Sequence, residues 1–139
     1  MLKEPDFVSS DASQSGSIMP VTRRVAVVED DAMLSLLLEE ICHHAGHTVV
    51  GRAHSPAEGL ALIREARPDC LLVDFQLNSE VDGIEVLRQA REMFPDIYSV
   101  LISGWNDNEI EERVSEVRPN GVLRKPLKTD DLVTLLAAR

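Results

Sequence analysis

Residues 70–73, with the sequence CLLV, form a short apolar run that ends in one acidic residue, Asp74. Pro68 stands two residues before the run, which is too short for a helix and predicts a strand buried on both faces. A carboxylate at the end of such a strand emerges at the carboxyl edge of the sheet, where open α/β sheets bind their ligands. The run therefore predicts a buried parallel strand with a site at its end.

Three other apolar runs also end in polar or charged residues. If their strands lie parallel and side by side, those side chains converge on one patch at the carboxyl edge of the sheet. Run 25–28 leads into Glu29, Asp30 and Asp31, run 100–102 into Ser103, and run 121–124 into Lys125 and Pro126. This patch is the candidate site.

Between the runs, apolar residues recur at helical spacing and turn residues mark the boundaries. Ser55 and Pro56, for example, form a capping and first-position pair, and Thr129 can cap the last helix. We expect strands over about 24–28, 48–53, 70–74, 98–102 and 121–124, each followed by a helix. Such short connections between parallel strands require right-handed crossovers. The pattern predicts one domain with a three-layer α/β fold.

Composition restricts the function. The net charge of −10 argues against binding to a nucleic-acid backbone, and no apolar run is long enough to span a membrane. The amino terminus has no secretory signal pattern, so we expect a cytoplasmic protein. Residues 1–22 are rich in serine and predict a flexible tail, and residues 23–139 form the expected folded domain. Cys42 and Cys70 fit small buried hydrophobic residues, and the four histidines fit surface or capping positions.

Glu29, Asp30 and Asp74 would repel one another if they met at this edge without a counter-charge. A hard divalent cation resolves the repulsion, and carboxylate and carbonyl oxygens suit Mg²⁺. Asp74 could then attack phosphorus to form an acyl phosphate, with Lys125 and Mg²⁺ neutralising charge and the Ser103 hydroxyl donating to a phosphoryl oxygen. Each motif alone also fits a cap or a turn, and it is their convergence that favours a phosphoryl-transfer site.

Four short motifs together resemble the receiver domain of two-component response regulators, over about residues 23–139. They are Val27-Val28-Glu29-Asp30-Asp31, Leu71-Leu72-Val73-Asp74, Ile102-Ser103-Gly104 and Arg124-Lys125-Pro126. The resemblance implies a flavodoxin-like (CheY-like) three-layer α/β sandwich, with five helices around a five-stranded parallel sheet of order 2-1-3-4-5. It also implies signalling by phosphorylation, without turnover of a separate substrate.

The same resemblance implies roles for the acidic residues. Asp74 would accept a phosphoryl group from a histidine kinase or a phosphotransfer protein. Asp30, Asp74 and the backbone carbonyl of Gln76 would bind Mg²⁺, and Glu29 would reach the ion directly or through water. The peptide bond before Pro126 is a candidate for the cis form.

Three departures from the family pattern matter. The loop from Asp74 to Gly83 is one residue longer than usual, and Asn78 stands where proline is common. Val122 occupies the position of the usual switch aromatic. Because valine has no ring, the family's usual coupling of phosphorylation to the movement of an aromatic ring cannot operate in its ordinary form. Trp105 borders the expected phosphorylation site, and we expect it to shield the aspartyl phosphate from water or to contact a partner.

These patterns favour a stand-alone receiver, as a monomer or a phosphorylation-dependent homodimer, with no nucleic acid and no membrane insertion. Two alternatives stay open. A pseudo-receiver would bind its partners constitutively, and a Mg²⁺-dependent phosphohydrolase would also form an aspartyl phosphate. Such hydrolases commonly place a second acid two residues after the nucleophile, where this chain has Gln76.

Overall fold

The computed structural model describes residues 19–104 and 110–139. Within these ranges, the strands form one parallel sheet in the order β3-β2-β4-β5-β6, which is the expected 2-1-3-4-5 when they are counted along the chain. The strands are β2 (Arg24–Val28), β3 (Thr48–Ala53), β4 (Cys70–Asp74), β5 (Tyr98–Ser103) and β6 (Gly121–Arg124). Trp105 and most of the expected tail, up to residue 18, lie outside the described residues.

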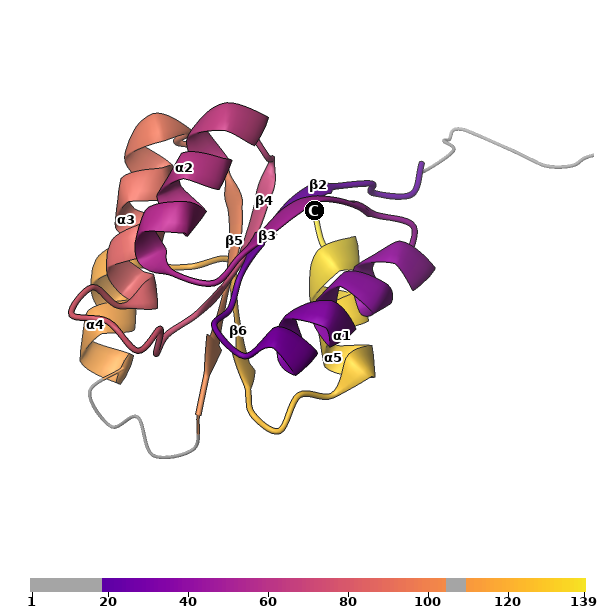
Figure 1. Ribbon diagram of the computed structural model, residues 1–139. Helices are drawn as coiled ribbons and strands as arrows, with labels where there is room; N and C mark the ends of the chain where they lie inside the picture. The colour runs from indigo at the N-terminus through magenta and orange to yellow at the C-terminus, as the bar shows by residue number, and fades with distance from the viewer. Residues whose placement is uncertain (1–18, 105–109) are drawn as a thin grey trace, which may run out of the picture.

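Five helices, counted within the same ranges, cover the two faces of the sheet. The helices α1 and α5 lie on one face, and α2, α3 and α4 lie on the other (Figure 1). Their bounds are α1 (Ala32–His44), α2 (Pro56–Ala66), α3 (Gly83–Met93), α4 (Ile110–Val117) and α5 (Thr129–Ala137). None of these helices is long and apolar enough to cross a membrane. The predicted three-layer α/β sandwich is confirmed.

Local sequence fixes where α1 and α2 begin. The side chain of Asp31 accepts hydrogen bonds from two backbone N–H groups in the first turn of α1, and Ser55 caps α2. Helix α5 differs, because its first residue is Thr129 and the Lys128 carbonyl already accepts a hydrogen bond from the Leu132 N–H. The expected cap at Thr129 is therefore wrong.

Two apolar clusters form the core, one on each face of the sheet. Alternate residues of β4 enter them, Leu71 and Val73 on the side of α2, α3 and α4, and Cys70 and Leu72 on the side of α1 and α5. This two-sided burial explains why β4 is a continuous apolar run. Both cysteines are buried free thiols, as predicted, and burial raises the pKa of Cys42 to about 12.

Arg23 fastens the amino edge of the sheet to the last helix. Its backbone N–H donates to Nδ1 of His47 at 3.0 Å, its Nε donates to the Leu136 carbonyl at 2.8 Å, and its guanidinium lies 3.7 Å from the centre of the Tyr98 ring. His47 is only 6% exposed, so the expectation of a surface or capping position is wrong for this histidine. The buried ring supplies the acceptor for the Arg23 amide.

Candidate functional site

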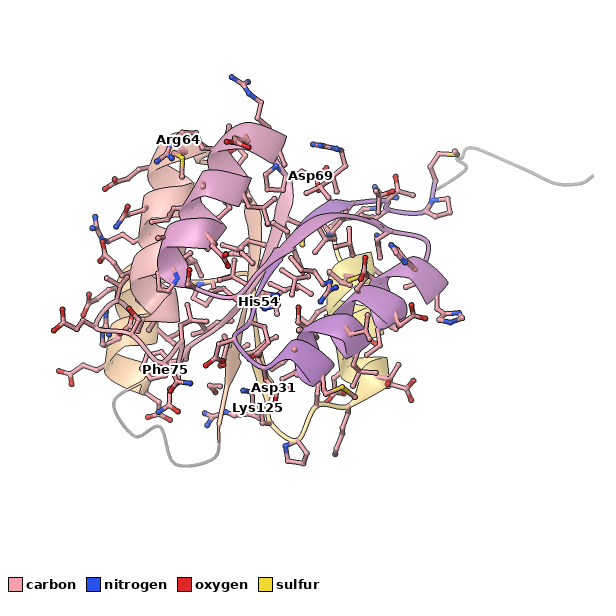
Figure 2. The ribbon with its side chains drawn as sticks, in the orientation of Figure 1. Asp31, His54, Arg64, Asp69, Phe75 and Lys125 are labelled. Atoms are coloured by element: carbon pink, nitrogen blue, oxygen red, sulfur yellow. The ribbon has the colours of Figure 1, made fainter. Side chains whose placement is uncertain are left out.

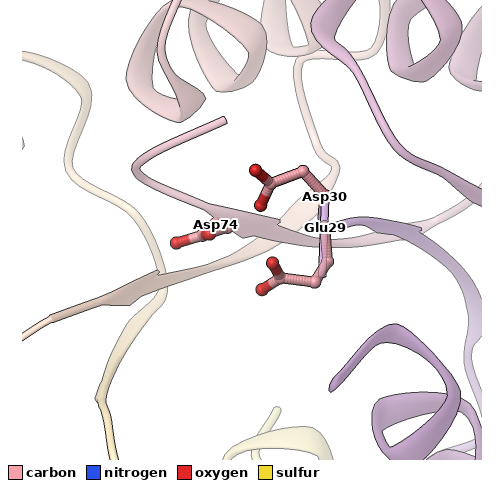
Figure 3. A group of neighbouring side chains, drawn as sticks. All are labelled: Glu29, Asp30 and Asp74. Carbon is pink, nitrogen blue, oxygen red and sulfur yellow. The ribbon is translucent and has the colours of Figure 1, made fainter. Parts of the chain in front are cut away.

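Three carboxylates meet at the carboxyl edge of two neighbouring strands, β2 and β4. Glu29 and Asp30 directly follow β2, and Asp74 is the last residue of the neighbouring strand β4. Each offers an oxygen atom, and these oxygens all lie within 4.8 Å of one another. Figure 3 shows the carboxyl groups of Glu29 and Asp30 turned toward Asp74. Glu29 and Asp74 are buried and Asp30 is half-buried, so water screens their mutual repulsion poorly.

Lys125 brings a positive charge to the same place. It directly follows β6, and its Nζ lies 3.2 Å from Oδ2 of Asp74 and 3.7 Å from Oε1 of Glu29. Its backbone N–H donates to the Ser103 carbonyl at 2.8 Å, which holds it against the end of β5. The peptide bond between Lys125 and Pro126 is cis. Figure 2 shows Lys125 at one end of the sheet, with Asp69, which precedes β4, at the other.

Burial and mutual repulsion shift the ionisation of these groups. Burial is the main cause that raises the pKa of Glu29 to about 8, and the neighbouring Asp74 charge adds to the effect. Burial also raises the pKa of Asp74, although Lys125 opposes the shift. Burial works against the Lys125 charge, yet Asp74 and Glu29 together raise the pKa of Lys125. One ammonium therefore leaves the three carboxylates with an excess of negative charge.

Two buried oxygens of this region have no hydrogen-bond partner among the described residues, Oε1 of Glu29 and Oγ of Ser103. Native structures rarely leave buried polar atoms unpaired unless a ligand, an ion or water satisfies them. Carboxylate oxygens with an excess negative charge are the donor set that a hard divalent cation such as Mg²⁺ prefers. The residues present therefore fit a divalent cation beside an oxygen-rich ligand.

The remaining predicted residues lie around this cluster or outside the described ranges. Gln76 is exposed in the loop after β4, and its backbone N–H donates to Oδ1 of Asp74 at 3.3 Å. Val122, in the position expected for a switch aromatic, is 38% exposed on β6. Trp105 lies outside the described residues, so its expected role stays a prediction.

Comparison with known proteins decides the family. A family model described as "Response regulator receiver domain" matches residues 25–137, which include all four strand-end motifs. This chain belongs to the response regulator receiver family. Receiver domains are signalling switches of two-component systems rather than metabolic enzymes, and they generally bind Mg²⁺ at an acidic site.

Individual relatives of this receiver domain are distant. The transcriptional regulatory protein PdtaR of Mycobacterium tuberculosis is 27% identical over 115 residues, which cover 81% of this chain and 54% of that protein. The chemotaxis protein CheY of Thermotoga maritima is 23% identical over 82% of this chain and 94% of its own. The receiver domain of a modulated diguanylate cyclase from Desulfovibrio desulfuricans G20 superposes with a TM-score of 0.74 at 27% identity, over 84% of this chain and 91% of its own. The chain spans about half the length of most of the curated relatives it matches.

The sequence did not indicate two contacts of this receiver domain. Nδ2 of Asn78 donates to Oδ2 of Asp30 at 2.5 Å, and Nδ1 of His54 lies 3.0 Å from the backbone oxygen of Glu29. His54 directly follows β3, so the rule that strand ends converge at one edge applies to it as well. Asn78 was notable in the sequence only as a replacement for proline. Its contact crosses from one loop to another, and no local pattern reports such a contact.

Proposed function

We propose that this receiver domain is a phosphorylation-dependent switch that accepts a phosphoryl group on Asp74, in the presence of Mg²⁺, from a histidine kinase or a phosphotransfer protein. The observation that supports this most directly is the position of Asp74. Its buried carboxylate ends the central strand β4, 3.2 Å from Nζ of Lys125 and beside Glu29 and Asp30. A carboxylate nucleophile flanked by cationic groups is what phosphoryl transfer to an acid requires.

In the proposed reaction, a carboxylate oxygen of Asp74 forms a bond to phosphorus while the donor's bond to phosphorus breaks. Lys125 lies close enough to follow the charge from the carboxylate to a phosphoryl oxygen. Oγ of Ser103 has no hydrogen-bond partner among the described residues, and its hydroxyl could donate to another phosphoryl oxygen. Glu29, Asp30, Asp74 and the Gln76 carbonyl would hold Mg²⁺, which when bound neutralises charge on the transferred group.

Intact-mass measurement after incubation with acetyl phosphate and MgCl₂ tests the proposal. We expect the wild-type chain to gain one phosphoryl group, and the variant Asp74→Asn to gain none. Asp69→Asn is the matched control, because it makes the same chemical change at the opposite end of β4, where Asp69 accepts a hydrogen bond from the Arg24 N–H. Asp69→Asn should gain one phosphoryl group like the wild type, and EDTA should suppress the reaction in both of these proteins.

Three results would contradict the proposal. An equal phosphoryl adduct on Asp74→Asn would place the acceptor elsewhere. Absence of any adduct on the wild type, both with acetyl phosphate and with a phosphorylated histidine kinase, would favour a constitutive scaffold. Steady release of phosphate from an added phosphate ester would favour the hydrolase alternative.

A further inference from the structure

Asn78 connects the loop after β4 to the acidic cluster. Its side-chain amide donates to Oδ2 of Asp30 at 2.5 Å, although the two residues are 48 positions apart in the sequence. Asp30 is the most exposed of the three clustered carboxylates. The contact joins a residue that follows β2 to a loop that follows β4.

The loop holds Asn78 in place from both sides. The preceding residue, Leu77, is only 3% exposed and packs in the core on the side of α2 and α3. Asp82 caps α3 through the Glu85 N–H and forms an ion pair with Arg113 of α4. Asn78 itself has a φ of 48°, a left-handed backbone conformation that asparagine tolerates better than most residues. The loop backbone is therefore anchored on both sides of Asn78, at Leu77 and at Asp82.

The other two carboxylates have fixed partners of their own. Oε2 of Glu29 accepts a hydrogen bond from the Asp31 N–H at 3.0 Å, and Asp74 is held by Nζ of Lys125 and the Gln76 N–H. Asn78 gives Asp30 an equivalent donor. An ionised carboxylate has several lone pairs on its two oxygens, so a hydrogen bond to Oδ2 restricts the orientation of the Asp30 carboxylate and still leaves lone pairs that can bind a cation.

We propose that Asn78 is a positioning residue of the metal site, and that it favours Mg²⁺ over Ca²⁺ by fixing the Asp30 carboxylate. The proposal rests on the proposed function, because it takes the acidic cluster to be a Mg²⁺ site. Mg²⁺ demands near-ideal octahedral geometry with short bonds, whereas Ca²⁺ accepts longer bonds and irregular ligand sets. A carboxylate released from its hydrogen bond therefore harms Mg²⁺ binding more than Ca²⁺ binding.

The variant Asn78→Gly separates the amide from the backbone. Glycine adopts positive φ without strain, so this change removes the hydrogen bond to Asp30 and leaves the left-handed conformation accessible. Ser79→Gly is the matched control, because it adds the same chain freedom one residue later and keeps the amide of Asn78. It also removes a loop hydrogen bond, the one that Oγ of Ser79 accepts from the Val81 N–H at 3.3 Å. Asn78→Asp is a second variant, which keeps the size and tolerates the same backbone but cannot donate to Asp30 when ionised.

Isothermal titration calorimetry of the metal-free proteins with MgCl₂ and with CaCl₂, at constant ionic strength, gives the two affinities. We expect Asn78→Gly to bind Mg²⁺ about ten-fold more weakly, the lower end of what loss of a supporting hydrogen bond costs a metal site. Its Ca²⁺ affinity should change less, so the preference for Mg²⁺ falls. Asn78→Asp should also lose preference for Mg²⁺, because its ionised side chain cannot donate to Asp30. Its added charge attracts both cations alike, so this attraction cancels in the ratio of the two affinities. Ser79→Gly should match the wild type.

The outcomes distinguish this inference from the proposed function. If the wild type binds Mg²⁺ and Asn78→Gly keeps the same Mg²⁺ affinity, Asn78 has no positioning role. If Asn78→Gly loses affinity for both cations equally, Asn78 supports the site but does not favour Mg²⁺, and the inference is overturned. In both cases the metal site stands. If the wild type binds no Mg²⁺, the metal site itself is wrong, and the inference fails with it.

Discussion

Glu29 combines full burial with incomplete hydrogen bonding. It has no exposed surface, one of its oxygens has no hydrogen-bond partner among the described residues, and Asp74 stands beside it. A buried, poorly paired carboxylate costs free energy of folding, so the chain bears this cost at the place where a cation would be held. The raised pKa of Glu29 expresses the same cost, because protonation is the way a buried carboxyl avoids an uncompensated charge.

The metal-free protein should therefore lose stability as the pH rises. Folding raises the pKa of Glu29 from 4.5 to about 8. The contribution of its protonated carboxyl group to folding stability is therefore fully present below pH 4.5 and is lost as the pH rises through 8. We expect Glu29→Gln, measured by urea unfolding in EDTA, to gain stability relative to the wild type between pH 5.5 and 8.5, by on the order of a few kcal/mol.

Other groups also titrate, such as His47, whose pKa is lowered by burial. Their contributions to the free energy of unfolding are shared by the variant and the wild type, so they cancel when the two proteins are compared at the same pH. A stability difference between Glu29→Gln and the wild type that does not change with pH would show that Glu29 titrates normally in the folded protein.

The junction between β4 and α3 positions the acceptor strand. The Gly83 N–H donates to the Phe75 carbonyl at 2.8 Å, so the first residue of α3 lies directly against the end of β4. A Cβ at Gly83 would lie well inside 3.0 Å of the backbone oxygen of Asp74. The ion pair between Asp82 and Arg113 joins the start of the same helix to α4. The end of β4, which carries Asp74, is thus connected to the start of α3, and the start of α3 is connected to α4.

Replacing Gly83 by alanine should disturb this junction. The clash is with backbone, which cannot rotate away, so we expect Gly83→Ala to lose about 1–3 kcal/mol of stability, as overpacking does, and to accept a phosphoryl group more slowly. Gly121→Ala is the control, because its added Cβ would meet the flexible end of the Leu135 side chain. Urea unfolding and intact mass measure both effects. Equal losses in the two variants would mean that the contact with Asp74 has no special weight.

At the scale of the whole molecule, the features that could be predicted from the sequence are those that repeated local patterns determine, namely the strands, the helices and their layers. The alternation of apolar runs with helical spacing predicted the three layers, and the polar residues at four strand ends predicted the convergence of Glu29, Asp74 and Lys125. The strand order was predicted only from the resemblance to receiver domains. The burial of His47 and the bond from Asn78 to Asp30 escaped prediction, because each joins segments that only the folded chain brings together. The cap of α5 escaped because capping depends on where the preceding loop enters the helix.

The two edges of the sheet differ in charge balance, and we therefore expect the stability of the protein to depend on cations. At the amino edge, Arg23 contacts a carbonyl and an aromatic ring, whereas the cluster at the carboxyl edge, counted over the described residues, sets three carboxyl groups against one lysine. A cation that binds only the folded state stabilises it, by about 2.7 kcal/mol at a hundred times its Kd. We expect MgCl₂ to raise the urea midpoint of the wild type, and KCl at equal ionic strength to have little effect. Asp30→Asn should lose most of the Mg²⁺ effect, because it removes a carboxylate ligand. Equal stabilisation of Asp30→Asn would place the responding cation site away from this edge.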